Sequence, residues 1–219
     1  MMVQFNSDMF SILWFSVGVS AIAAAIAAAI GVPLGIFLGM KEFKGKIVIV
    51  NITNSFMGFP PVVMGVIVYL FLSSAGPLGF LHLLYTPTAI IIAQSLLCIP
   101  IISGITISAV TNHNKKIAET TLALGGSRWD IYENVFSENL IQILSGIMVG
   151  FGQSISEVGA SLIVGGNISY YTQTMTTAIV TYTQMGRPDL ALSLGLILIT
   201  ASFFIILTLT FIQMKNRKR

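Results

Sequence analysis

Charged side chains are scarce in this 219-residue chain: Asp, Glu, Lys and Arg make up 9% of it, whereas 55% of the residues are hydrophobic. A soluble domain carries about 25% charged residues. The chain therefore has too little polar side chain to solvate a globule, which excludes a soluble domain and indicates an integral membrane protein. Its length fits one domain that covers residues 1–219.

Cysteine and the common catalytic motifs are also lacking. The single cysteine, Cys98, excludes a disulfide or a cysteine metal cluster within one chain. No P-loop, His-Glu-x-x-His or Ser/His/Asp set is evident, so no catalysis, metal or cofactor is expected, and nothing points to a nucleic-acid partner. An intramembrane enzyme would need a nucleophile and a base, but the predicted spans offer only Cys98 and Glu157, without a histidine beside either.

Long uncharged stretches are abundant instead. A membrane span needs about 20 apolar residues, and residues 47–114 contain no Asp, Glu, Lys or Arg. As one helix this region would be roughly 100 Å long, so it must double back, and the turn formers in SSAGPLGFLHLLYTPT mark the reversal. We predict an all-α membrane protein with five transmembrane helices, at about 10–40, 49–72, 88–110, 140–162 and 190–212. The first is too long for a signal peptide and is expected to be retained, and the outer loop, about 163–189, is expected to hold a short surface helix.

Positive charge predicts the orientation. With five spans the termini lie on opposite sides of the membrane. If the N-terminus is outside, ten of the eleven Lys and Arg residues lie inside and Arg187 alone lies outside. This agrees with the positive-inside rule and predicts a cytoplasmic C-terminus and a cytoplasmic loop at about 111–139. The ten inner residues are Lys41, Lys44, Lys46, Lys115, Lys116, Arg128, Lys215, Arg217, Lys218 and Arg219.

Prolines and small residues mark special points in the spans. Pro60-Pro61 and Pro100 remove backbone donors and are expected to kink or break their helices, which is tolerated at membrane depth only where the break is buried or lines a cavity. Small residues at every fourth position let helices approach closely. Packing within the chain is the simpler interpretation, and a dimer seam or sliding surface is the alternative. These residues are Ala23, Ala27, Gly31, Gly35 and Gly39 in the first span, with Gly146 and Gly150 in the fourth.

A polar island at residues 115–138 contains seven of the chain's 19 charged residues. Residues 117–124 are compatible with a helix, and Gly125-Gly126 should end it because glycine accepts the left-handed conformation. Ser127 with Asp130 three residues later predicts a capping box that starts a second helix. This helix–glycine–helix hairpin is suited to bind a soluble partner. Its second helix carries an apolar face made of Trp129, Tyr132, Val135 and Phe136.

The same loop resembles the EAA loop of ABC importer permeases. That family's pattern is Glu-Ala-Ala, three residues, Gly, nine residues, Ile-x-Leu-Pro, and here Glu119-Thr120-Thr121 is followed by Gly125 and Val135 at the same spacing. The closing Leu-Pro is replaced by Ser137-Glu138, so the helix is expected to run on into the fourth span. The resemblance implies a coupling helix that enters a cleft of the ATPase subunit. The candidate coupling residues are Glu119, Thr120, Thr121, Gly125, Gly126 and Arg128.

A second resemblance covers much of the remaining chain. SEVGASLIVGGNISYYTQTMTTAI, residues 156–179, is similar to a region of oxyanion importer permeases and looks most like the tungstate-type branch, as do residues 58–79 and 83–94. Gln153 stands where many relatives have arginine. The resemblance implies a type I ABC importer permease fold and a homodimer with two ATPase subunits and one extracytoplasmic substrate-binding protein. It also implies the plasma membrane of a prokaryote and import of tungstate, or alternatively of molybdate or another small solute.

Candidates for the translocation path or its gate follow from polar residues and breaks in the spans. Glu157 is the only acidic residue within a predicted span. An ionisable side chain at membrane depth usually has a function. A bare carboxylate would repel an anion, so we favour a structural, hydrogen-bonded Glu157 over a gate. The threonines near the outer mouth either line an anion route or form a solvated loop. A membrane scaffold remains an alternative to a permease. The candidates are Pro60, Pro61, Ser154, Glu157, Thr174 and Thr177.

Overall fold

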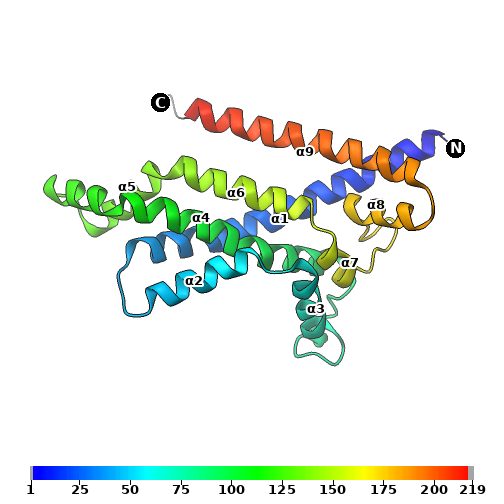
Figure 1. Cartoon of the computed structure of the whole chain (residues 1–219), viewed down its shortest axis with the longest axis horizontal. Helices are drawn as coiled ribbons and strands as arrows, with labels where there is room; N and C mark the ends of the chain where they lie inside the picture. Colours follow the sequence, from blue (N-terminus) through cyan, green and yellow to red (C-terminus); the bar gives the residue numbers. More distant parts are fainter. Residues whose placement is uncertain (1, 217–219) are drawn as a thin grey trace.

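The computed structural model describes the backbone of residues 2–216 and, apart from residues 2–8, 112–115, 212, 215 and 216, their side chains. Within that part the chain is helical and has no strand, which confirms the all-α prediction (Figure 1). Five of the basic residues that predict the orientation lie outside the described side chains, namely Lys115 and the four at the C-terminus. The elements in order are α1 (Met2–Met40), α2 (Lys46–Met57), α3 (Pro61–Leu72), the short 3₁₀ turn η1 (Gly79–Leu81), α4 (Pro87–Ala123), α5 (Arg128–Glu138), α6 (Leu140–Ile155), α7 (Gly159–Gly165), α8 (Met175–Gln184) and α9 (Pro188–Asn216).

Three helices are each long and apolar enough to cross a membrane, within α1, α4 and α9. Their spans, Met9–Met40, Pro87–Thr111 and Pro188–Phe211, match the predicted first, third and fifth spans. Two bent helix pairs, α2 with α3 and α5 with α6, bring the number to five if each pair counts as one span. The second pair includes α5, which belongs to the predicted polar loop, whereas the predicted fourth span at 140–162 covers α6 and part of α7. The number of five spans therefore stays a prediction.

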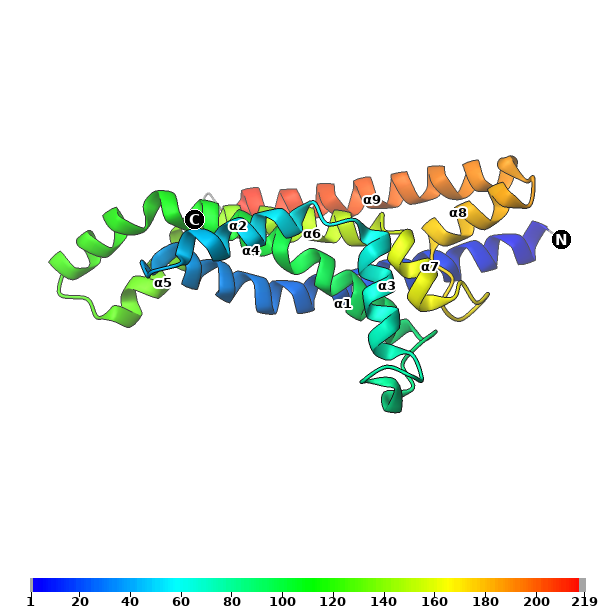
Figure 2. The same ribbon diagram turned by 60° about the horizontal axis from the view of Figure 1, so that its bottom comes forward.

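The second and third helices meet at a sharp bend. Their axes differ by 102° across Gly58–Pro60, where Pro60 precedes α3 and Pro61 begins it. Proline suits this first helical position because its missing N–H would have no intrahelical partner. Figures 1 and 2 show α3 and the loop after it projecting from the side of the bundle. The predicted break at Pro60-Pro61 is thus confirmed, whereas α4 continues through Pro100 without a break.

Two predictions about the fourth span are wrong. The helix was expected to run on from the polar loop, but α5 ends at Glu138 and α6 begins at Leu140, with a bend of 60° between them. A continuous span at 140–162 was expected, but α6 ends at Ile155 and α7 starts at Gly159. At the first bend the buried Asn139 amide donates to the Val135 carbonyl at 2.8 Å. The Asn139 N–H donates to the same carbonyl at 3.2 Å, so the side chain adds a second bond that holds the end of α5 without a proline.

The central element is α4, and the small residues of α1 pack against it. A Cβ built on Gly31 would lie 3.2 Å from Ile102 Cβ, and one on Gly39 would lie 2.8 Å from Val110 Cβ. On the other side of α4, a Cβ on Gly150 would lie 2.9 Å from Ile102 Cδ1. The glycines thus bring three helices into close contact within one chain, as small residues do in lipid. Of the two interpretations of the small-residue stripe, packing within the chain is the one that the structure shows.

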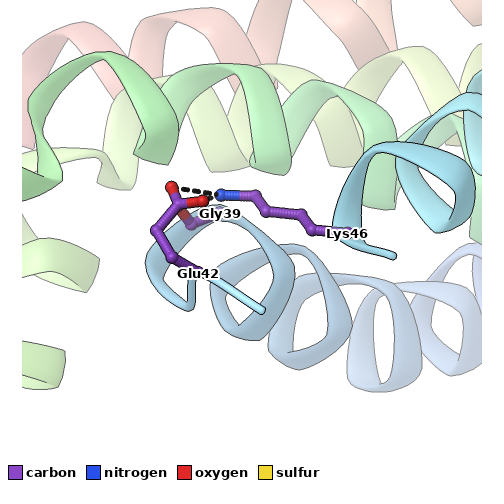
Figure 3. A network of polar contacts seen from close by, with 3 residues as sticks. All are labelled: Gly39, Glu42 and Lys46. Carbon is purple, nitrogen blue, oxygen red and sulfur yellow. Dashed lines mark hydrogen bonds and ion pairs between the residues drawn. The ribbon is translucent and has the colours of Figure 1, made fainter. Parts of the chain in front are cut away.

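The link between α1 and α2 is closed by one lysine (Figure 3). Lys46 Nζ lies 3.0 Å from Glu42 Oε1 and 3.5 Å from the Gly39 carbonyl in the last turn of α1. A cation near a helix C-terminus interacts favourably with the carbonyls exposed there. Lys46 therefore fixes the short turn that sends α2 back along the bundle.

The predicted outer loop, residues 163–189, contains the expected short helix, α8. Figure 1 shows α8 near the N-terminal end of α1 and beside the start of α9, while α5 and the C-terminal end of α9 lie at the opposite end of the bundle. The Met175 N–H at the start of α8 donates to Ser16 Oγ of α1 at 2.7 Å. The arrangement gives the bundle two distinct ends, and each terminus lies at one of them.

Cysteine labelling checks which end is cytoplasmic. We expect an impermeant thiol reagent to label a cysteine placed at Ser7 but not one placed at Asn216 in intact cells, because the positive charges predict an outside N-terminus and an inside C-terminus. The native Cys98 is fully buried and should contribute no background. The opposite labelling pattern would overturn the orientation and remove the polar loop from the cytoplasm.

Candidate coupling loop and translocation site

The polar loop folds as the predicted hairpin of two helices. The first, the end of α4, stops at Ala123, and Gly125 follows with φ +82°, a left-handed conformation that glycine adopts without strain. The Gly126 N–H donates to the Thr121 carbonyl at 2.9 Å, which satisfies an end group of α4. Helix α5 then returns from Arg128. The predicted stop at the glycine pair is therefore confirmed.

The start of α5 is held by the predicted capping box. The Ser127 N–H donates to Asp130 Oδ2 at 2.6 Å, and the Asp130 N–H donates to Ser127 Oγ at 3.3 Å. Hydrogen bonds from the Ser127 backbone and then from its side chain hold the pKa of the Asp130 carboxyl below its ordinary value. Asp130 is therefore charged at neutral pH, which also suits the N-terminus of α5.

Thr121 ties the two arms of the hairpin together. The Asn134 amide on α5 donates to Thr121 Oγ1 at 3.0 Å, while this hydroxyl donates to the Ile117 carbonyl of α4. An alanine, as in the family pattern, has no oxygen to accept the Asn134 bond. The departure to threonine thus adds a cross-link between the arms.

The other candidate coupling residues lie at the surface of the hairpin. Glu119, Thr120 and Arg128 are exposed. A cleft of about 660 Å³ runs between the arms, with Thr120, Thr121, Asp130 and Asn134 among its lining residues. Because the loop is structured but exposed, it presents a fixed surface at one end of the bundle.

The predicted apolar face of α5 is divided. Val135 is fully buried inside the hairpin, whereas Trp129 is 77% exposed. The sequence analysis missed two exposed leucines at the end of α4, Leu122 and Leu124, the second of which is 84% exposed. Together with Trp129 they form an apolar tip, which is unusual on a surface unless a partner covers it.

The second group of candidates lies where two broken helices meet. A Cβ built on Gly159, the first residue of α7, would lie 2.5 Å from Val62 Cγ2, and one on Gly65 would lie 2.7 Å from the Ala160 Cα. The first turns of α3 and α7 therefore cross in direct backbone contact. This crossing places Pro60 and Pro61, which begin α3, near the α6–α7 break that contains Glu157.

Glu157 is hydrogen-bonded rather than free. It is 4% exposed, and its Oε1 accepts from the Ala160 N–H at 2.8 Å. Its backbone carbonyl accepts from Thr176 Oγ1 of α8, also at 2.8 Å. A buried carboxylate needs such donors, since burial without them costs several kcal/mol. The carboxyl group thus has the structural, hydrogen-bonded surroundings that the sequence analysis favoured, and a role as a gate stays a prediction.

Thr174 and Thr177 form a capping box at the start of α8. The Thr177 N–H donates to Thr174 Oγ1 at 3.3 Å and the Thr174 N–H donates to Thr177 Oγ1 at 2.9 Å. Both residues are buried, as are Thr172 and Thr176. The interpretation of these threonines as a solvated loop is therefore wrong. Through Thr176 this buried cluster is joined to the α6–α7 break.

Ser154 takes part in a network that the sequence analysis missed. Its hydroxyl donates to Gln94 Oε1 at 2.8 Å, and Gln94 Nε2 donates to the Ser154 carbonyl at 3.1 Å and to Ser161 Oγ at 3.4 Å. All three residues are buried. A lone glutamine inside an apolar span was the available signal, because a polar side chain at membrane depth is expected to have a partner.

Comparison with known proteins identifies the class. Residues 31–216 match the family described as the inner membrane component of binding-protein-dependent transport systems. The chain belongs to this family, whose members are permease subunits of ABC transporters. Such subunits are not enzymes, and ATP hydrolysis belongs to a partner subunit. The chain is accordingly a multi-pass membrane protein.

Particular relatives are oxyanion permeases. The chain is 39% identical over 205 residues to the tungstate uptake system permease protein TupB of Peptoclostridium acidaminophilum, covering 94% of this chain and 90% of that protein. It is 38% identical over 194 residues to a probable anion ABC transporter permease protein of Haloferax volcanii, covering 86% and 84%. The TupB of Campylobacter jejuni is 36% identical over 162 residues, covering 74% and 68%. These similarities confirm the resemblance to the tungstate-type branch.

A solved structure shares the fold. A chain from the crystal structure of an amino acid ABC transporter with histidines superposes with a TM-score of 0.66, covering 100% of this chain and 96% of that one. The sequence identity is 15%, so this likeness concerns the fold alone. It confirms the expected type I ABC importer permease fold.

Proposed function

We propose that this protein is the permease subunit of an importer that carries tungstate across the plasma membrane of a prokaryote. The observation that supports this most is the similarity, over 94% of the chain, to a permease named for tungstate uptake. The order of the elements, with an exposed coupling loop between apolar helices, agrees with that role. Molybdate is the nearest alternative cargo, since a molybdenum permease of Haemophilus influenzae is 26% identical over 155 residues.

The working unit in this proposal is a homodimer with two ATPase subunits and one extracytoplasmic binding protein. The described surface of one chain leaves much apolar area without protein contacts: no residue of α2 is buried, and 11% of the most apolar window of α9 is buried. The bilayer covers part of this area, and a second copy would cover another part. The path would lie between the two copies, where the exposed Pro60 could line it. Ser154, Glu157, Thr174 and Thr177 are buried in the single chain and would lie behind that surface.

The coupling residues would transmit ATP binding to the membrane. Closure of the two ATPases would move the hairpins that hold Glu119, Thr120, Thr121, Gly125, Gly126 and Arg128. Pro60 and Pro61 would form part of the wall of the path. The buried Ser154, Glu157, Thr174 and Thr177 would gate it by moving the helix breaks that they hold. Breaks at membrane depth are typical of transport sites.

The path has no fixed cation to trap an oxyanion. No Lys or Arg occurs at positions 47–114 or at 140–186 of the sequence. A dianion held by such a cation in a dry site would bind too tightly to leave, and conduction requires weak sites. We propose that selectivity resides in the binding protein, which docks on the outer surface, and that neutral hydroxyl and amide groups pass the anion inward.

Elemental analysis tests the cargo. We expect deletion of this protein to lower cellular tungsten when tungstate is supplied at about nanomolar concentration, where tight binding proteins work, while sulfate uptake stays normal. Wild-type and deleted cells grown on trace tungstate and molybdate would be compared. Unchanged tungsten with a loss of molybdenum would discard tungstate and keep the permease.

A further inference from the structure

One buried side chain joins both arms of the broken fourth span to the central helix. Gln94 of α4 is 2% exposed, and both the nitrogen and the oxygen of its side-chain amide form hydrogen bonds. Its Nε2 donates to the Ser154 carbonyl in the last turn of α6 and to Ser161 Oγ in α7, and its Oε1 accepts from Ser154 Oγ. These are hydrogen bonds between segments 60 and 67 residues apart in the sequence. Gln94 therefore fixes the position of the break relative to α4.

The bond to the Ser154 carbonyl has a specific structural reason. Carbonyls in the last turn of a helix lack intrahelical partners, and inside a membrane each such group must be satisfied by protein. This carbonyl also accepts from the backbone N–H groups of Ser156 and, at 3.2 Å, of Glu157. Gln94 thus adds a donor from another helix, which ties the end of α6 to α4.

The same helix carries the first arm of the coupling loop. α4 is continuous from Pro87 to Ala123, so Gln94 and Thr121 are parts of one rod. They are 27 positions apart, which corresponds to about 40 Å at ~1.5 Å per residue. At the cytoplasmic end Thr121 is bonded to Asn134 of α5, and at the other end Gln94 is bonded to α6 and α7. Both ends of α4 are therefore attached through side-chain hydrogen bonds, and rigid elements of this kind carry coupling between distant sites.

We infer that Gln94 is a positioning residue that transmits movement of the cytoplasmic hairpin along α4 to the break between α6 and α7. The inference rests on the proposed function of the loop and of the path. When the hairpin moves, α4 moves with it, and the amide of Gln94 moves Ser154 and Ser161 together. Without this amide α6 follows α4 through the bond of Cys98 Sγ to the Gly150 carbonyl, at 3.1 Å, and through apolar packing, while α7 loses its side-chain hydrogen bond to α4. ATP hydrolysis then becomes uncoupled from cargo movement.

The test measures the number of tungstate ions moved per ATP hydrolysed. The permease is reconstituted in liposomes with its ATPase and loaded binding protein, and uptake and hydrolysis are measured on the same sample. Gln94→Leu keeps a side chain of similar size but removes all three hydrogen bonds. We expect it to assemble and to hydrolyse ATP near the wild-type rate, while the ratio of tungstate to ATP falls about tenfold, within the range of ordinary coupling energies.

The matched control is a buried polar residue on another face of α4. Thr106 is fully buried, and its hydroxyl donates only to the Ile102 carbonyl of its own helix, at 2.7 Å. Thr106→Val removes a buried hydrogen bond without changing any bond between helices. The number of tungstate ions that this variant moves per ATP should equal that of the wild type. Were Gln94→Leu to keep the wild-type ratio, or both variants to lose it equally, Gln94 would have no transmitting role.

Two further measurements complete the test. If Gln94→Leu does not assemble, the double variant Ser154→Ala with Ser161→Ala removes the two bonds to serine hydroxyls and leaves the bond to the Ser154 carbonyl. A smaller fall in the ratio is then expected, and an unchanged ratio would reject the inference. A wild-type complex that hydrolyses ATP but moves molybdate and no tungstate would contradict the proposed cargo alone, and the same ratio would then be measured with molybdate.

Discussion

Gly125→Trp is expected to abolish uptake and co-purification of the ATPase while the membrane helices still assemble. Gly125 has φ +82°, and a residue with a side chain loses roughly 1–2 kcal/mol in this left-handed conformation. The turn between α4 and α5 would shift, and the Trp129 end of α5 would leave the position from which it reaches a partner. Uptake of the cargo and the amount of ATPase retained by the tagged permease are the two measurements.

The matched control is another glycine in the left-handed conformation, where any residue with a side chain would be strained. Gly186 has φ +70° and, like Gly125, no atom within 4 Å of a built Cβ, but it lies in the outer loop. Gly186→Trp should leave the ATPase bound. Glu119→Ala tests the other end of the motif. Uptake that persists unchanged in both Gly125→Trp and Glu119→Ala would show that this loop does not couple the permease to the ATPase.

Gly35→Leu is expected to destabilise the packing of α1 against α4. A Cβ on Gly35 would lie 2.5 Å from Thr106 Cβ and 2.9 Å from the Ser103 carbonyl oxygen of α4. The carbonyl is backbone and cannot turn away, so α1 and α4 would have to separate along their common seam. Overpacking of this kind costs typically 1–3 kcal/mol, and more where backbone is displaced. Thermal unfolding of the purified protein in detergent should occur at a clearly lower temperature.

A glycine on the same helix serves as the comparison. Nothing lies within 4 Å of a Cβ built on Gly18, so Gly18→Leu should unfold near the wild-type temperature. Equal unfolding temperatures for Gly35→Leu and Gly18→Leu would mean that α1 does not pack on α4 through its small-residue stripe. The seam would then be an interface between copies instead.

Local signals in the sequence were sufficient for the coupling hairpin. The stop at Gly125 and the box of Ser127 with Asp130 each depend on atoms within a few residues along the chain, so residue types at fixed spacing specify them. The box of Thr174 with Thr177 has the same geometry and was missed. Its third helical position holds threonine instead of the usual Glu or Gln, so the standard pattern did not reveal it.

Bends without a local breaker were not predictable in the same way. Pro60-Pro61 announces the turn between α2 and α3, but neither Asn139 nor residues 156–158 include a proline, and the sequence was therefore interpreted as continuous helix there. The structure shows why the breaks are tolerated. Asn139 bonds back to Val135 four residues earlier, which is a local bond, whereas the end of α6 is bonded by Gln94 of α4. Only the second break therefore depends on a partner from the tertiary structure.

The sequence alone was sufficient for the membrane location, the helical class and the family, because each follows from composition or from residue spacing along the chain. The orientation that the positive charges indicate stays a prediction. The tertiary structure decided which helices touch and which candidate residues lie together. It packed the small-residue stripe of α1 on α4, buried the threonines near α8, and connected Gln94 to Ser154 and Ser161. Such contacts join segments far apart in the sequence, and in an apolar chain any helix face can pack against several others. Only the shape of the assembled bundle selects among them.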